Sequence, residues 1–134
     1  TVTLNNVDLN GPTQGTYTRG ISIYDVPKVK VVMDNCSLSA NYYAINLASA
    51  APNAEIVVKN TTLTGWCAFQ THSPYSNVTT GNTQYLLSVR AKNTTLIAEN
   101  CSFYVDGTEV SIEDVPNYVS VYPEVIDSFN FTLK

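Results

Sequence analysis

Few residues in this chain have the types and spacing that catalysis requires. The sole histidine, His72, stands in a Thr-His-Ser-Pro segment at an expected corner, where it is only a weak candidate for a catalytic acid or a ligand. Arg90 and Glu113 are an acid–base combination that could approach across neighbouring strands, but a salt bridge explains such a pair equally well. The chain contains no phosphate-binding loop, no cysteine and histidine spacing for zinc and no nucleophile elbow. We therefore expect no catalytic centre, no cofactor and no metal.

Two further groups of side chains are candidates for ligand binding. Four acidic residues fall close together, which suits a weak calcium site at most; they are Asp106, Glu109, Glu113 and Asp114. Aromatic side chains gather near expected corners, where they would stack on sugars or cover the edges of the fold; they are Tyr42, Tyr43, Trp66, Tyr75 and Tyr85.

The elements that must position these residues follow from an eight-residue sequence repeat, called the phrase below. It is clearest at residues 31–38, Val-Val-Met-Asp-Asn-Cys-Ser-Leu, and it returns at 2–9, 56–63 and 96–103. Each copy has apolar or β-branched residues at positions one, three, six and eight, with asparagine at position five. Weaker copies occupy 78–85 and 126–133, so the asparagines would be Asn6, Asn35, Asn60, Asn82, Asn100 and Asn130. A competing frame for the fifth copy would use Asn93.

The phrase predicts two short strands joined by a bend. The inward positions change parity at the fourth and fifth residues, and asparagine tolerates the left-handed conformation that such a bend needs. A second repeated segment, a short strand before a proline turn, is expected at 20–24, 43–47, 67–70, 87–90 and 110–113. Repeats of 18 to 30 residues without a helical pattern predict a solenoid of short strands with stacked asparagines.

At this level the chain resembles a right-handed parallel β-helix of the pectate-lyase-like type, as found in secreted or cell-surface bacterial proteins. The resemblance rests on the six asparagines and the apolar rows beside them, and it covers nearly all of the chain. The expected fold is all-β, with about six rungs and an asparagine turn ladder. Leucine-rich repeats lack the second strand set, and an immunoglobulin-like sandwich does not repeat one phrase six times.

The resemblance implies that a glycan lies along one strand face. The last outward position of the second strand set is then the candidate binding row; its members are Tyr24, Asn46, Gln70, Arg90 and Glu113. A tyrosine ring stacks on a sugar, amides bind hydroxyl groups and a guanidinium pairs with a carboxylate. An ordinary solvated face explains the same residues. We expect a non-catalytic, adhesin-like, glycan-binding or spacer module; the alternative is a polysaccharide lyase or glycoside hydrolase acting on an acidic polysaccharide.

Composition and charge limit the number of domains and the kinds of partner that the protein can have. The 134 residues are 44% hydrophobic, which suits one domain spanning 1–134 with a real core. Only 13% are charged and the net charge is −4, which argues against a nucleic-acid surface. No apolar run is long enough to span a membrane. Because the chain starts and stops within repeat phrases, we expect a piece of a larger secreted or cell-surface protein. Neighbouring rungs or self-association would then cover its ends.

Cysteines and glycosylation sequons both follow the repeat. Cys36 and Cys101 share position six of their copies, and three rungs of about 4.8 Å would separate them by roughly 14 Å. A disulfide needs Cα atoms within about 7 Å, so free buried thiols are expected. The sequons are interpreted mainly as by-products of the phrase; they lie at Asn35, Asn60, Asn77, Asn93, Asn100 and Asn130.

Overall fold

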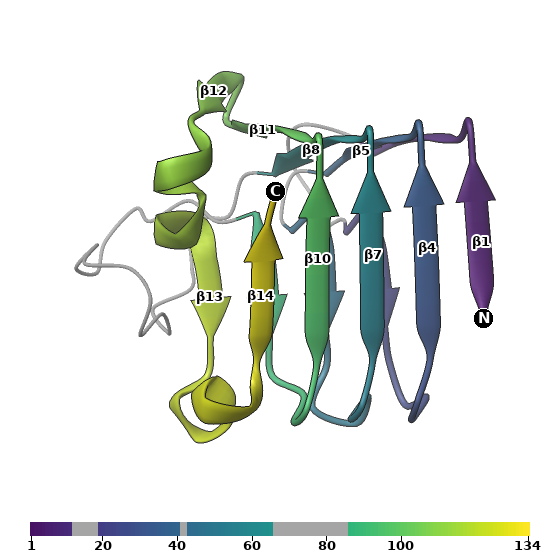
Figure 1. The fold of residues 1–134 in the computed structure, drawn as a ribbon, viewed down its shortest axis with the longest axis vertical. Helices are drawn as coiled ribbons and strands as arrows, with labels where there is room; N and C mark the ends of the chain where they lie inside the picture. The colour runs from purple at the N-terminus through teal and green to yellow at the C-terminus, as the bar shows by residue number, and fades with distance from the viewer. Residues whose placement is uncertain (12–18, 41–42, 66–85) are drawn as a thin grey trace.

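The computed structural model describes residues 1–11, 19–40, 43–65 and 86–134, and they form three β-sheets (Figure 1). The A sheet has the order β1 (Val2–Asn5), β4 (Lys30–Asp34), β7 (Glu55–Lys59), β10 (Thr95–Glu99) and β14 (Asn130–Leu133). The B sheet has the order β12 (Thr108–Val110), β11 (Ser102–Val105), β8 (Thr62–Gly65), β5 (Ser37–Ser39) and β2 (Asp8–Asn10). The C sheet has the order β13 (Val119–Val121), β9 (Leu87–Val89), β6 (Ile45–Leu47) and β3 (Ile21–Ile23).

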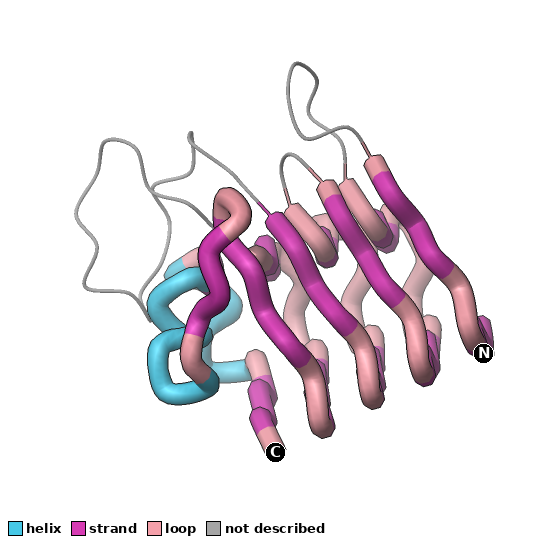
Figure 2. The backbone as a smooth tube through the Cα atoms, turned by 90° about the horizontal axis from the view of Figure 1, so that it is seen from above, coloured by secondary structure: helices cyan, strands magenta, loops and turns pink. Residues whose placement is uncertain are grey.

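The chain visits these sheets in turn, so neighbouring strands come from distant parts of the sequence. Every pairing in the A and C sheets is parallel. In the B sheet, β12 pairs antiparallel with β11, and the other pairings are parallel. Two 3-10 helices, η1 (Ile112–Tyr118) and η2 (Pro123–Ser128), interrupt the strands after β12 and β13 (Figure 2). No helix among the described residues is long and apolar enough to cross a membrane.

The core lies between the three sheets and follows the strand alternation. Successive side chains of a strand point to opposite faces, so every second residue of the phrase is buried. Leu38, Leu63 and Phe103 stand at equivalent positions of β5, β8 and β11, and each is at most 1% exposed. Burying a side chain of this size contributes about 1.5–3 kcal/mol. The predicted inward rows are confirmed for the A sheet at Val31, Met33, Ile56, Val58, Leu96 and Ala98.

The bend inside the phrase is made by asparagine, as predicted for four copies. Asn6, Asn35, Asn60 and Asn100 all have φ between 48° and 57°, the left-handed region. Asn100 Nδ2 donates to Asn60 Oδ1 at 2.7 Å, and Asn35 Nδ2 donates to Asn6 Oδ1. Asn60 Nδ2 instead donates to Asp34 Oδ1 at 2.8 Å, which breaks the asparagine ladder between Asn60 and Asn35. Three of the sequon amides are therefore hydrogen-bond donors within the fold.

A second left-handed corner connects the C sheet to the A sheet. Lys28, Asn53 and Asn93 have φ of 59°, 61° and 54°. The backbone N–H of Lys28 donates to the carbonyl of Pro52, and that of Asn53 donates to the carbonyl of Lys92. Asn93 therefore belongs to this corner, and the competing frame that placed it in the phrase is wrong.

The predicted regular β-helix of about six rungs is contradicted. β7 pairs directly with β10, from Glu55 with Thr95 to Lys59 with Glu99, so the A sheet leaves no place between them for a further rung. The copy predicted at 78–85, with Asn82, lies outside the described residues. The sheets contain five, five and four strands, and none is closed on itself. The fold is a three-sheet, mostly parallel β architecture that ends in an antiparallel hairpin and 3-10 helices.

The last predicted copy of the phrase is out of register. Asn130 pairs with Thr95 and Phe131 pairs with Leu96, so Asn130 begins a strand and is not at a bend. Most of the first half of the predicted copy lies in η2, which buries Val125. The apolar alternation that misled the prediction belongs to Phe129 and Phe131, whose rings stack with centroids 5.6 Å apart.

The strand predicted at 110–113 is also wrong. Val110 ends β12, and Ile112 starts η1 with 45% of its surface exposed. The fourth strand of the C sheet is β13, which pairs with β9. The shared Asp-Val-Pro sequence suggested equivalence, yet Asp25 has a left-handed φ of 55° in a turn, whereas Asp114 lies inside a 3-10 helix.

Candidate functional site

The C sheet presents a row of side chains immediately after its strands. The backbone N–H groups of Ala48, Arg90 and Tyr122 donate to the carbonyls of Ile23, Leu47 and Val89. These bonds continue the parallel ladder by one residue beyond each strand. The row is therefore Tyr24, Ala48, Arg90 and Tyr122, one residue from each layer of the sheet.

The predicted binding row is only partly reproduced. Tyr24 and Arg90 share the position after their strands, whereas Asn46 lies within β6, opposite Ser22 and Ser88. Glu113 lies in η1, away from the C sheet, and Gln70 is outside the described residues. The five residues do not form one row. Three of them, Tyr24, Asn46 and Arg90, nevertheless line one hollow.

We call this feature the arginine hollow. Its volume is about 250 Å³, and its lining consists of Arg19, Ser22, Tyr24, Asn46, Ala48, Ser49 and Arg90. Tyr24 is 71% exposed at its border, whereas Asn46 is only 7% exposed. Asn46 Nδ2 donates to Ser22 Oγ at 3.0 Å, which fixes the orientation of the amide. The hollow thus combines a free aromatic face with a held amide.

Arg90 is the most constrained polar group of the hollow. The centre of its guanidinium lies 4.5 Å from the centroid of the Tyr122 ring, a cation–π contact. Its Nε is buried and has no hydrogen-bond partner among the described residues. A buried donor without a partner costs about 1–3 kcal/mol, so an acceptor that reached it would be bound favourably. Arginine remains charged at all relevant pH values, and its fork of donors matches a carboxylate.

A second hollow lies on the other side of Arg90. Its volume is about 380 Å³, and its lining consists of Ser49, Pro52, Arg90, Lys92, Tyr122, Glu124 and Val125. Ser49 and Arg90 belong to both hollows, so the two hollows are neighbours at Arg90. Arg19, Arg90 and Lys92 give this surface three cations against the single carboxylate of Glu124. The surface therefore favours an anion.

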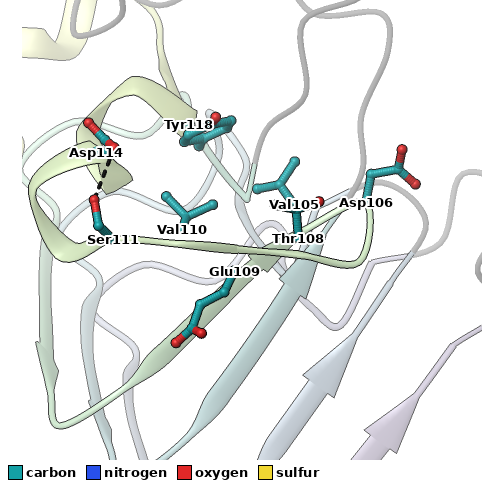
Figure 3. Close-up of a pocket in the computed structure, with 8 residues that line it drawn as sticks. All are labelled: Val105, Asp106, Thr108, Glu109, Val110, Ser111, Asp114 and Tyr118. Carbon is teal, nitrogen blue, oxygen red and sulfur yellow. Dashed lines mark hydrogen bonds between the residues drawn. The ribbon is translucent and has the colours of Figure 1, made fainter.

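A further hollow, of about 410 Å³, lies between the β11–β12 hairpin and η1 (Figure 3). Its lining includes the predicted acidic residues Asp106, Glu109 and Asp114, while Glu113 does not contribute. Asp114 Oδ2 accepts a hydrogen bond from Ser111 Oγ at 3.0 Å. The carboxylates of Asp106 and Glu109 point away from each other, and no set of three metal-ligating side chains gathers anywhere in the described part of the chain (Figure 3). The acidic patch therefore does not form the weak calcium site considered for it.

Of the remaining candidate residues, one is placed in the core and the others lie outside the described residues. Tyr43 is 1% exposed and belongs to the core, so its interpretation as an accessible sugar-stacking residue is wrong. The remaining corner aromatics, Tyr42, Trp66, Tyr75 and Tyr85, lie outside the described residues, and so does His72.

Cys36 and Cys101 are free thiols, as predicted. They are two layers apart and not three, because only Thr61 lies between them in the register of the B sheet corner. Each thiol donates to carbonyl oxygens, Cys36 to Leu4 at 3.4 Å and Cys101 to Val58 at 3.5 Å. Burial raises the pKa of the Cys101 thiol above its ordinary value.

The sequence analysis missed Tyr122, the residue that holds Arg90. The signal was present, because Ile-Ser-Ile-Tyr at 21–24, Leu-Ser-Val-Arg at 87–90 and Val-Ser-Val-Tyr at 119–122 share one pattern. The central serines of this pattern are paired in register across the C sheet, together with Asn46. A search for that tetrapeptide would have placed the fourth strand correctly.

No family model, curated protein or solved structure matches this chain. The resemblance to pectate-lyase-like repeats therefore stays a prediction, and the functional argument depends on the geometry alone.

Proposed function

We propose that this protein is a non-catalytic, extracellular carbohydrate-binding module that binds an acidic glycan over Arg90. One observation carries the proposal: a guanidinium fixed against an aromatic ring, with a buried and unpartnered Nε, borders two hollows on one surface. A carboxylate placed in either hollow would meet the positive charge of this guanidinium, whose Nε has no hydrogen-bond partner among the described residues.

The other residues of the arginine hollow suit a sugar. The ring of Tyr24 is exposed and can stack on the apolar face of a pyranose. Asn46 and Ser49 offer amide and hydroxyl groups for sugar hydroxyls. A few polar groups placed around an apolar surface are typical of small-ligand sites.

The absence of catalysis is part of the proposal. In the part of the chain that the structure describes, the side chains that line the arginine hollow include no carboxylate, histidine or cysteine. General acid–base catalysis by side chains needs groups that exchange a proton near the working pH, and arginine does so poorly. A polysaccharide lyase or glycoside hydrolase is the competing function, and it predicts turnover.

The test is calorimetric titration of the protein with a short oligogalacturonate and with its neutral galactose counterpart. We expect the acidic oligosaccharide to bind, and Arg90→Gln to weaken its binding by about 10- to 100-fold, since a hydrogen bond to a charged group is worth about 1.5–3 kcal/mol. Lys59→Gln is the matched control, because Lys59 is an exposed cation on the A sheet, and it should bind like the unsubstituted protein.

Three results would oppose this proposal. The first is the absence of any binding heat with either oligosaccharide. The second is equal affinity of Arg90→Gln and Lys59→Gln variants that both retain the far-ultraviolet dichroism of the parent. The third is accumulation of cleaved or unsaturated product that disappears in Arg90→Ala, which would establish the enzyme instead.

A second copy of the chain is a further proposed partner. It would use a different surface, at the end of the molecule that carries the N-terminus.

A further inference from the structure

Three sheet edges lie together at one end of the molecule. β1, β2 and β3 are each the terminal strand of their sheet, and they come from the first 23 residues (Figure 1). Among the described residues, no strand pairs with the outward side of β1, β2 or β3. Such edges are templates for pairing with another chain.

An apolar hollow opens at the same end. Its volume is about 310 Å³, and its lining consists of Val2, Leu4, Ile21, Ser22, Ile23, Tyr24, Val26, Val29 and Val31. Val2 is 47% exposed, Tyr24 is 71% exposed and Val26 is 47% exposed. Within the described ranges, the only other exposed large hydrophobic side chain is Ile112, in η1. Exposed apolar surface is therefore concentrated where the core opens, and such concentration marks interaction sites.

The opposite end of the molecule is closed differently. η1 and η2 lie at the end away from the N-terminus (Figure 2). Val115 of η1 and Val125 of η2 are 0% and 4% exposed and belong to the core cluster. β12 turns back on β11 as an antiparallel strand and forms the last edge of the B sheet. In the described ranges, this end has no apolar hollow to match the one at the N-terminal end, so head-to-tail stacking of copies is disfavoured.

We propose that the N-terminal end is a homodimer interface, formed when the same end of a second copy covers it. A twofold contact places a surface against itself, so a charged surface would repel its partner. Among the described residues, those that line the apolar hollow include no charged side chain. Asp25 and Lys28 are exposed beside Val26, in the same turn, and provide opposite charges for the rim of a self-complementary contact. The nearby Lys30 is already paired with Glu55 at 3.1 Å.

Sedimentation velocity and light scattering over a concentration series test this inference. The unsubstituted protein should be a dimer at micromolar concentration, and Val26→Lys should raise the dimer dissociation constant at least tenfold. Ile112→Lys is the matched control, because Ile112 is exposed to almost the same extent but lies at the other end of the molecule. Val2→Lys repeats the test on β1 if Val26→Lys does not fold.

A monomer at every concentration would overturn the inference, and so would an open-ended series of oligomers. A dimer that survives Val26→Lys and Val2→Lys but is lost in Ile112→Lys would also overturn it. The two surfaces share Ser22 and Tyr24, but the substituted residues Val26 and Val2 do not line the arginine hollow, so the test distinguishes this inference from the proposed glycan site. Val26→Lys should therefore retain binding of the acidic oligosaccharide.

Discussion

Arg90 shows how much of the proposed function depends on single contacts. Its position follows from the β9 strand, but its orientation follows from Tyr122, a residue 32 positions later in the chain. A flexible arginine would lose side-chain entropy on binding, whereas an arginine held on a ring has lost part of it already. The ring therefore prepares the guanidinium for a carboxylate.

This dependence predicts a difference between two substitutions of Tyr122. Tyr122→Leu removes the cation–π contact, worth about 0.5–2 kcal/mol, and should weaken oligogalacturonate binding by about 2- to 30-fold. Tyr122→Phe keeps the ring and should leave the affinity nearly unchanged. Calorimetry on both variants checks this, and an equal loss in the two would show that the ring does not position Arg90.

The thiol of Cys101 predicts a dependence of stability on pH. Burial raises the pKa of this thiol in the folded state. As the pH rises through the ordinary thiol range, at about 8.5, the thiol therefore loses its proton in the unfolded chain before it does so in the folded protein. The free energy of unfolding should therefore fall in that range. Urea denaturation should show that the stability of the parent relative to Cys101→Ala is smaller above this range than at neutral pH. A constant or growing difference would contradict the shift.

At the scale of the elements, the phrase with its asparagine bend is the unit of construction. Asn60 is its central member, since it donates to Asp34 and accepts from Asn100 while holding a φ of 48°. The side chain thus performs two tasks. It tolerates the left-handed conformation and connects three layers of the A sheet.

Two substitutions separate these tasks. Asn60→Gly keeps the left-handed conformation accessible and removes the two hydrogen bonds, which should cost about 1–3 kcal/mol of unfolding free energy. Asn60→Ala adds the left-handed penalty of about 1–2 kcal/mol. Urea denaturation should therefore rank the parent above Asn60→Gly and Asn60→Ala lowest. Equal stability of the two variants would mean that the backbone conformation is not strained by a Cβ atom.

Local patterns of the sequence were sufficient for the elements that repeat regularly. Apolar alternation placed the core positions of β4, β7 and β10, and asparagine marked four bends. The pattern failed where a similar string of residues serves another local structure. Asp-Val-Pro occurs in a turn at 25–27 and in a 3-10 helix at 114–116, and sequence spacing alone does not distinguish them. The position in the phrase was also wrong for Asn130, and for Asn93 in the competing frame, because asparagine occurs at other corners and at strand starts as well.

The candidate site was harder to predict than the core. Tyr24, Asn46 and Arg90 were proposed from a single outward row, yet they meet because the hollow spans two positions of the C sheet. Glu113 was assigned to the sheet through the mistaken strand at 110–113. Tyr122 was missed because its partner lies in a different layer, and the contact is only defined once the register of β9 and β13 is known.

At the scale of the whole molecule, the two proposed surfaces share two border residues, Ser22 and Tyr24. Tyr24 lines both the arginine hollow on the C sheet and the apolar hollow at the N-terminal end. The surfaces otherwise differ in character, since one has three nearby cations and the other has no charged lining residue. Because Tyr24 is proposed both to stack on a sugar and to border the dimer contact, the two proposed interactions meet at this side chain.

The most direct test of the proposed function is a map of the bound oligosaccharide on the protein. Backbone amide resonances should be followed by nuclear magnetic resonance while the acidic oligosaccharide is added. We predict that the largest shifts cluster at Asn46, Ser49, Arg90 and Tyr122, and that they vanish in Arg90→Gln. Shifts confined to the acidic hollow between β12 and η1, or no shifts at saturating oligosaccharide, would contradict the account.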